Sequence, residues 1–192
     1  MPGQRRWRRR EAVMGGMALA AGVAAPRALA QSTAPALPDA DAAILGRLLE
    51  IEQALAVAYE AAAASDIVDA EVEPALELFA DQEREHAETL ASALADLGGT
   101  PPGPPRPDEV DGLEELFSQS AMLEFFVARE REAIALYGEA ATLLAAPDLL
   151  KTGAQIVANE TQHLVVLRQQ LGEEPVSEIF ASGTLDGPRG AG

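Results

Sequence analysis

Four stretches of the chain carry apolar residues at every third or fourth position, with polar and charged residues between them. This spacing places the apolar side chains along one face of an α-helix. The predicted helices cover residues 39–64, 69–97, 113–146 and 148–171, with Asp41 and Gln119 as alternative first residues of the first and third. Glycine or proline ends the last three helices, at Gly98, Pro147 and Gly172. The pattern therefore predicts an all-α fold.

The connection between the second and third predicted helices is long and cannot be helical. Residues 98–108 read GGTPPGPPRPD, which indicates a stiff, extended segment. At about 3 Å per residue, this segment and the few residues after it can run the length of a helical bundle. Two helices, a long crossover and two more helices predict a four-helix bundle with one crossover between helices 2 and 3. Aromatic residues make up only 4% of the chain, and an all-β fold is excluded.

The two halves of the chain repeat one arrangement of chemically reactive residues. The first and third helices each carry a glutamate followed seven residues later by a tyrosine, namely Glu52 with Tyr59 and Glu130 with Tyr137. The second and fourth each carry a Glu-x-x-His unit, namely Glu83 with His86 and Glu160 with His163. The offset between the halves is 78 residues for the first pair and 77 for the second. The bundle is therefore predicted to contain two copies of one helical hairpin.

These six acids and imidazoles predict a site for two metal ions. A glutamate and a histidine three residues apart project from the same helix face, so each Glu-x-x-His unit offers an oxygen and a nitrogen to one point. All four glutamates lie in the middle of an apolar stripe, where an unpaired carboxylate costs several kcal/mol or takes up a proton. Both histidines of the chain belong to such units, which disfavours a surface coincidence.

Other polar residues receive simpler interpretations. Six glutamates lie off the apolar stripes and are predicted to face solvent, namely Glu50, Glu60, Glu85, Glu88, Glu132 and Glu139. Tyr59 and Tyr137 are predicted to lie in the core and to hydrogen-bond a ligand oxygen. A redox-active tyrosine is the alternative.

Residues 1–30 read as a cleavable export signal, with a basic start, a weakly apolar run and a small-residue cleavage site that ends at Ala30. The paired arginines among Arg8, Arg9 and Arg10 resemble a twin-arginine signal, although no Phe-Leu follows them, and the general secretory route is the alternative. The apolar run, residues 12–25, is shorter than the ~20 residues that span a bilayer, which disfavours a membrane anchor. The expected location is the periplasm or cell envelope.

After this leader the chain divides into a spacer at residues 31–38, the bundle at residues 39–172 and a partly ordered or disordered tail at residues 173–192. The leader contains six arginines and one acid, so its removal takes the net charge from −17 to about −22. Such an acidic surface disfavours nucleic acid and anionic membranes and suits metal ions. The absence of cysteine excludes disulfides, iron–sulfur clusters and thiolate sites.

The paired Glu and Glu-x-x-His pattern resembles the ferritin-like superfamily, in the exported bacterial group related to rubrerythrin and bacterioferritin. The resemblance covers about residues 39–172. It implies that Glu83 and Glu160 bridge two metal ions, that Glu52 and Glu130 each bind one ion, and that His86 and His163 complete the two positions. The chain lacks the cysteine-ligated iron domain of rubrerythrin and the basic tail of DNA-binding mini-ferritins.

This ligand set implies about five bonds per metal and one open coordination position. Two divalent ions would balance four carboxylates, and oxygen ligands with imidazole suit iron or manganese, while zinc could bind without redox use. We expect a di-iron oxidoreductase of ferroxidase or peroxidase type that acts on O₂, peroxide or Fe²⁺. The alternatives are a metal-binding or iron-storage protein without turnover and a structural envelope domain. A homodimer is suggested by the resemblance alone.

Overall fold

The computed structural model describes residues 38–176, which form four α-helices and two short 3₁₀ turns. The helices are α1 (Pro38–Ala63), α2 (Glu73–Asp96), α3 (Gln119–Leu143) and α4 (Pro147–Gln170), and the turns are η1 (Pro107–Glu109) and η2 (Leu113–Glu115). No strand occurs within residues 38–176, and the predicted all-α fold is confirmed. The predicted leader, nearly all of the spacer and most of the predicted tail lie outside the described residues.

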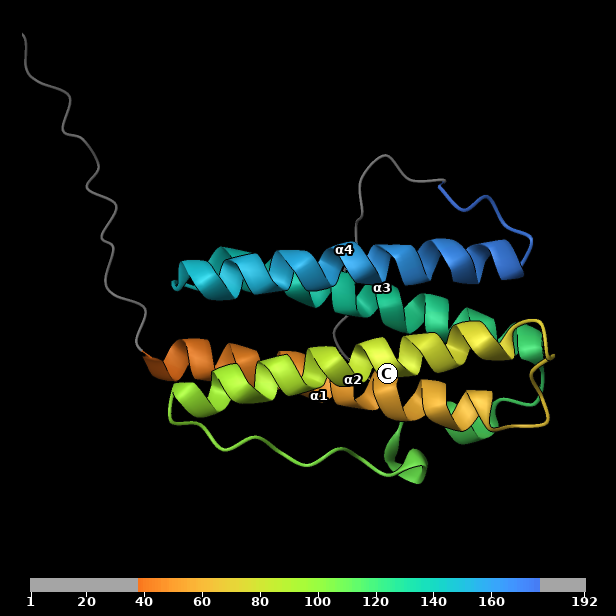
Figure 1. Ribbon diagram of the computed structural model, residues 1–192, viewed down its shortest axis with the longest axis horizontal. Helices are drawn as coiled ribbons and strands as arrows, with labels where there is room; N and C mark the ends of the chain where they lie inside the picture. Colours follow the sequence, from red (N-terminus) through yellow and green to blue (C-terminus); the bar gives the residue numbers. More distant parts are fainter. Residues whose placement is uncertain (1–37, 177–192) are drawn as a thin grey trace, which may run out of the picture. The chain divides into compact units, whose positions relative to one another are not determined.

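The four helices pack as two antiparallel hairpins, α1 with α2 and α3 with α4 (Figure 1). The crossover leaves the end of α2 and runs along the first hairpin to the opposite end of the bundle, where α3 begins (Figure 1). The amide of Gln53 on α1 donates a hydrogen bond of 2.9 Å to the carbonyl oxygen of Pro102, which holds the crossover against the bundle. The predicted topology with one long connection between helices 2 and 3 is observed.

The second helix starts four residues later than the sequence pattern predicts. It begins at Glu73, with Pro74 in its first turn, where a missing N–H leaves no carbonyl unpaired. Asp69, the predicted start, is engaged elsewhere: its backbone N–H donates to the side chain of Gln119, whose amide donates back to the Asp69 carboxylate. This pair ties the α1–α2 loop to the first residue of α3.

The third helix is shorter than the longest predicted span at both ends. It begins at Gln119, the later of the two predicted starts, because the Ser118 hydroxyl accepts a hydrogen bond from the backbone N–H of Ala121 and caps it. It ends at Leu143 rather than residue 146, and the backbone is already extended at Leu144, three residues before Pro147.

The core consists of two apolar clusters with the predicted metal-binding residues between them along the helices. One cluster includes Leu76 and Phe126, and the other includes Leu48 and Leu90. On α1, Glu52 follows residues of the second cluster and precedes residues of the first. Four carboxylates in the middle of an apolar core therefore require partners inside that core. None of the helices within residues 38–176 is long and apolar enough to cross a membrane.

Candidate metal centre

Each of the four helices carries one of the predicted glutamates to the centre of the bundle. The side chains of Glu52, Glu83, Glu130 and Glu160 are 0% exposed, although each lies on a helix that shows polar residues to solvent. His163 is 1% exposed, and the side chain of His86 is 13% exposed. The six glutamates predicted to face solvent are all exposed. The structure thus brings together all six predicted ligand residues and leaves these six other glutamates at the surface.

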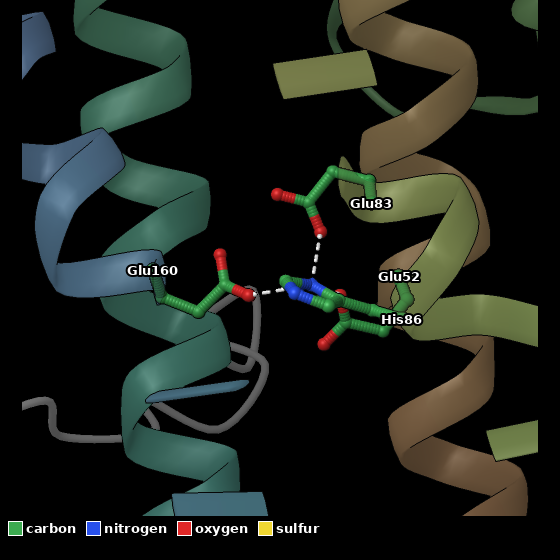
Figure 2. A group of neighbouring side chains, drawn as sticks. All are labelled: Glu52, Glu83, His86 and Glu160. Atoms are coloured by element: carbon green, nitrogen blue, oxygen red, sulfur yellow. Dashed lines mark hydrogen bonds and ion pairs between the residues drawn. The ribbon is translucent and has the colours of Figure 1, made fainter. Parts of the chain in front are cut away.

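The first group of side chains surrounds His86. Its Nδ1 atom lies 3.2 Å from Glu52 Oε2, 3.3 Å from Glu83 Oε2 and 3.0 Å from Glu160 Oε1. Figure 2 shows the imidazole ring of His86 between carboxylates that come from both hairpins, with Glu83 above the ring, Glu160 to its left and Glu52 close below it. One nitrogen and three carboxylate oxygens therefore converge on one point.

The second group repeats this arrangement around His163. Its Nδ1 atom lies 3.0 Å from Glu83 Oε1, 3.2 Å from Glu130 Oε1 and 3.3 Å from Glu160 Oε2. Glu83 and Glu160 belong to both groups, and each directs one carboxylate oxygen to each histidine. This sharing is the geometry that two bridging carboxylates need.

The spacing of these atoms suits ligands of one ion. Two ligand atoms about 2.1 Å from a metal and at right angles to one another lie about 3 Å apart. The six distances from the imidazole nitrogens to the carboxylate oxygens are 3.0–3.3 Å. Within each group, all the ligand atoms lie within 4.8 Å of one another. Each set of side chains is therefore close enough together to surround one cation.

Hydrogen bonding within the protein leaves several of these oxygens without a well-directed donor. Among the described residues, both oxygens of Glu160, Oε1 of Glu83 and Oε2 of Glu130 are buried and receive no well-directed hydrogen bond, although the first three lie 3.0–3.3 Å from an imidazole nitrogen. Each imidazole can donate only one proton from Nδ1, and three carboxylates surround that nitrogen. Four carboxylates and two imidazolium rings together carry a net charge of −2 in the core. The same four carboxylates with two divalent cations and neutral imidazoles carry no net charge. The residues present therefore fit a pair of divalent cations.

Without metal, the acids and imidazoles shift one another's proton affinity. Burial raises the pKa of Glu52 and of Glu130 well above its usual value. Burial lowers the pKa of His86, but hydrogen bonds to the surrounding carboxylates outweigh it and raise this pKa to about 12. The same balance raises the pKa of His163 to about 11. Burial opposes ionisation of Glu160, yet the imidazoles of His163 and His86, 3.3 and 3.0 Å from its oxygens, leave its pKa below the usual value. Protons thus take the place of metal in the metal-free chain.

These shifts predict that the metal-free protein loses stability as the pH rises above neutrality. Between the ordinary histidine pKa of 6.5 and the folded values of about 11 and 12, the folded chain binds more protons than the unfolded chain. The contribution of both histidines is therefore complete below pH 6.5 and declines above it. Urea unfolding of chelator-treated protein at pH 6, 7.5 and 9 should give a decreasing free energy of unfolding. A free energy that increases over this range would contradict the assignment.

The two core tyrosines cross from one hairpin to the other. The Tyr137 hydroxyl of α3 donates a hydrogen bond of 2.6 Å to Oε1 of Glu52 on α1. The Tyr59 hydroxyl of α1 donates a hydrogen bond to Oε1 of Glu130 on α3. Burial, followed by the adjacent carboxylate, raises the pKa of each tyrosine well above 10, so both hydroxyls keep their protons. Each tyrosine thereby fixes the glutamate of the opposite half.

Replacing either tyrosine by phenylalanine should remove this donor and leave a buried carboxylate oxygen with one partner fewer. We expect Tyr59→Phe and Tyr137→Phe each to lower the free energy of unfolding by about 1–3 kcal/mol. Because neither hydroxyl is a predicted ligand, the metal content should stay at the wild-type level. Denaturant unfolding and metal analysis of the same samples measure both quantities. A variant with the wild-type free energy of unfolding would show that the hydrogen bond does not stabilise the fold.

The sequence pattern missed one residue at this site. Oε1 of Gln82 on α2 lies 2.8 Å from Nε2 of His163 on α4, on the side of the ring away from the carboxylates. Gln82 is half-buried and lies outside the repeated Glu and Glu-x-x-His pattern. Its position next to Glu83 is the only sequence signal, because the partner ring comes from the other hairpin.

Comparison with known proteins agrees with the fold and the ligand pattern. The family model described as a ferritin-like domain matches residues 40–173. This span includes all four helices from near the start of α1 and all six predicted ligand residues. No curated protein matches the chain. With a four-helix bundle, one long crossover and a family match over most of its length, the chain belongs to the ferritin-like domain family.

Proposed function

We propose that the protein binds two metal ions, with iron as the expected metal, and acts as an oxidoreductase of the ferroxidase or peroxidase type. The observation that carries the proposal is the sharing of Glu83 and Glu160 between two groups, each completed by one histidine and one further glutamate. Carboxylate oxygens with imidazole nitrogens suit iron and manganese. Two iron ions bound so close together would be able to exchange electrons with Fe²⁺, O₂ or peroxide.

The protein contributes a fixed and dry environment to this chemistry. The carboxylates come from four different helices, so their positions depend on the packing of the whole bundle. Tyr59 and Tyr137 hold Glu130 and Glu52 by hydrogen bonds. The apolar clusters on both sides exclude bulk water, which strengthens the attraction between the carboxylates and a cation. Neutral imidazole at both histidines requires that cations displace the protons these rings hold in the metal-free chain.

Rapid mixing tests the proposed activity. The Fe²⁺-loaded protein is mixed with H₂O₂ or with O₂, and the absorbance of the ferric product is followed. Wild-type protein should oxidise Fe²⁺ faster than the same amount of free Fe²⁺, and a Glu83→Ala/Glu160→Ala variant should not exceed the rate in buffer. Stoichiometric iron binding without faster oxidation in the wild type would exclude the oxidoreductase and favour a binding or storage role.

We also propose that the protein is exported to the periplasm or cell envelope, on the basis of residues 1–30. Sequencing the N-terminus of the protein recovered from the periplasmic fraction should identify Gln31 as the first residue. Replacement of Arg8, Arg9 and Arg10 by lysine should stop export if the route is the twin-arginine one. Recovery of a full-length chain from the cytoplasmic fraction alone would contradict export.

A further inference from the structure

The two halves of the site repeat in sequence but differ in how the histidines are held. His163 is 1% exposed, and its Nε2 lies 2.8 Å from Oε1 of Gln82. The side chain of His86 is 13% exposed, and no hydrogen-bond partner for its Nε2 is found within residues 38–176. The repeat offset of 77 residues places Asn159, rather than glutamine, at the position that corresponds to Gln82. The internal symmetry is therefore broken behind the histidine rings.

Aromatic packing adds to this difference. The ring of Phe79 stacks obliquely on His163, with centroids 4.1 Å apart, and the Tyr59 ring packs nearly perpendicular to the same imidazole, with centroids 6.3 Å apart. The repeat offset places Ile156 at the position of Phe79 in the other half. The His163 ring is thus enclosed by an amide and two aromatic rings.

The contact with Gln82 selects one form of the His163 ring. Nδ1 of His163 faces the carboxylates, so a metal ligand at this position must carry its proton on Nε2. The amide oxygen of Gln82 can accept that proton's hydrogen bond and fix both the tautomer and the ring orientation. The proton on Nε2 of His86 has no such acceptor in the described part of the chain.

From this difference we infer that Gln82 is a positioning residue for His163 and makes the two metal positions unequal. The position completed by His163 fills first and binds more tightly, and the position completed by His86 fills second and exchanges its ion more readily. The inference rests on the proposed function, because it presupposes that the two groups bind metal. It adds a residue and an order of binding that the symmetric ligand pattern does not contain.

Titration of the chelator-treated protein with Co²⁺, followed by visible absorption, tests the inference. The wild-type chain should bind two Co²⁺ ions in two resolved steps. Gln82→Ala should weaken the tighter step about 10- to 100-fold and leave the weaker step unchanged. Gln82→Glu should retain the tighter step, because a carboxylate also accepts the Nε2–H hydrogen bond. The matched control is Asn159→Ala, which should change neither step.

Variants of the two histidines assign the steps. His163→Ala should abolish the tighter step, and His86→Ala should abolish the weaker one. Equal effects of Gln82→Ala and Asn159→Ala, no effect of Gln82→Ala, or two indistinguishable steps in the wild type would each overturn the inference while metal binding stands. Failure of the wild type to bind Co²⁺ at all would overturn the proposed function, and this inference with it.

Discussion

Replacing both Glu83 and Glu160 by alanine should reduce the bound metal from about two ions per chain to none. Each of these carboxylates directs one oxygen to the His86 group and the other to the His163 group. Loss of both side chains therefore removes two ligand oxygens from each metal position. Elemental analysis of the purified variant measures the effect directly. The matched control is Glu85→Ala, which removes an exposed glutamate from the same helix and should leave the metal content unchanged.

Single variants at the other glutamates should separate the two positions. Glu52 contacts only the His86 group and Glu130 only the His163 group. Glu52→Ala should therefore lower the metal content by about one ion and leave the His163 position filled. If the Glu83→Ala/Glu160→Ala variant kept one ion per chain, the two metal positions would not share these carboxylates, and the proposed arrangement would be wrong.

Removing the metal should strongly destabilise the folded protein. A chelator leaves four carboxylates, all fully buried, next to one another in the core, with several oxygens unpaired. By mass action, an ion present at a thousand times its dissociation constant stabilises the fold by about 4 kcal/mol, and two ions contribute about twice that. Urea unfolding followed by circular dichroism, with and without chelator, should show a loss of this size.

A Glu83→Gln/Glu160→Gln variant serves as the control for chelation. Its side chains keep their size but lose the charges that bind cations, so the chelator should not change its stability. Unfolding curves of the wild type that coincide with and without chelator would show that the fold does not depend on metal, and would favour a structural role for the bundle.

Much of the fold follows from the sequence because its local and global signals agree. Apolar spacing predicts the helices, and the proline-rich crossover predicts the topology. The repeat with offsets of 78 and 77 residues distinguishes Glu52, Glu83 and their counterparts from many other acids. Glutamates at matching positions on apolar helix faces indicate one common function, which is to bind cations. Their burial at 0% exposure agrees with that reasoning.

Features that depend on packing between hairpins could not be predicted in the same way. The periodicity of α2 does not reveal that the Asp69 carboxylate, the predicted cap, accepts a hydrogen bond from Gln119 instead, while the helix begins at Glu73. Spacing along α1 places Tyr59 near Glu52, whereas in the fold its hydroxyl reaches Glu130 on α3. The contact of Gln82 with His163 likewise joins two helices that no sequence spacing relates.

The metal content of the protein purified under anaerobic conditions tests the central claim most directly. Two metal ions per chain are predicted, held between the hairpins where Glu83 and Glu160 belong to both ligand groups. Inductively coupled plasma mass spectrometry gives this number without any assumption about activity. A result of about two ions, absent from the Glu83→Ala/Glu160→Ala variant, would support the account. Wild-type protein with no stoichiometric metal, before and after incubation with Fe²⁺ or Mn²⁺, would contradict it.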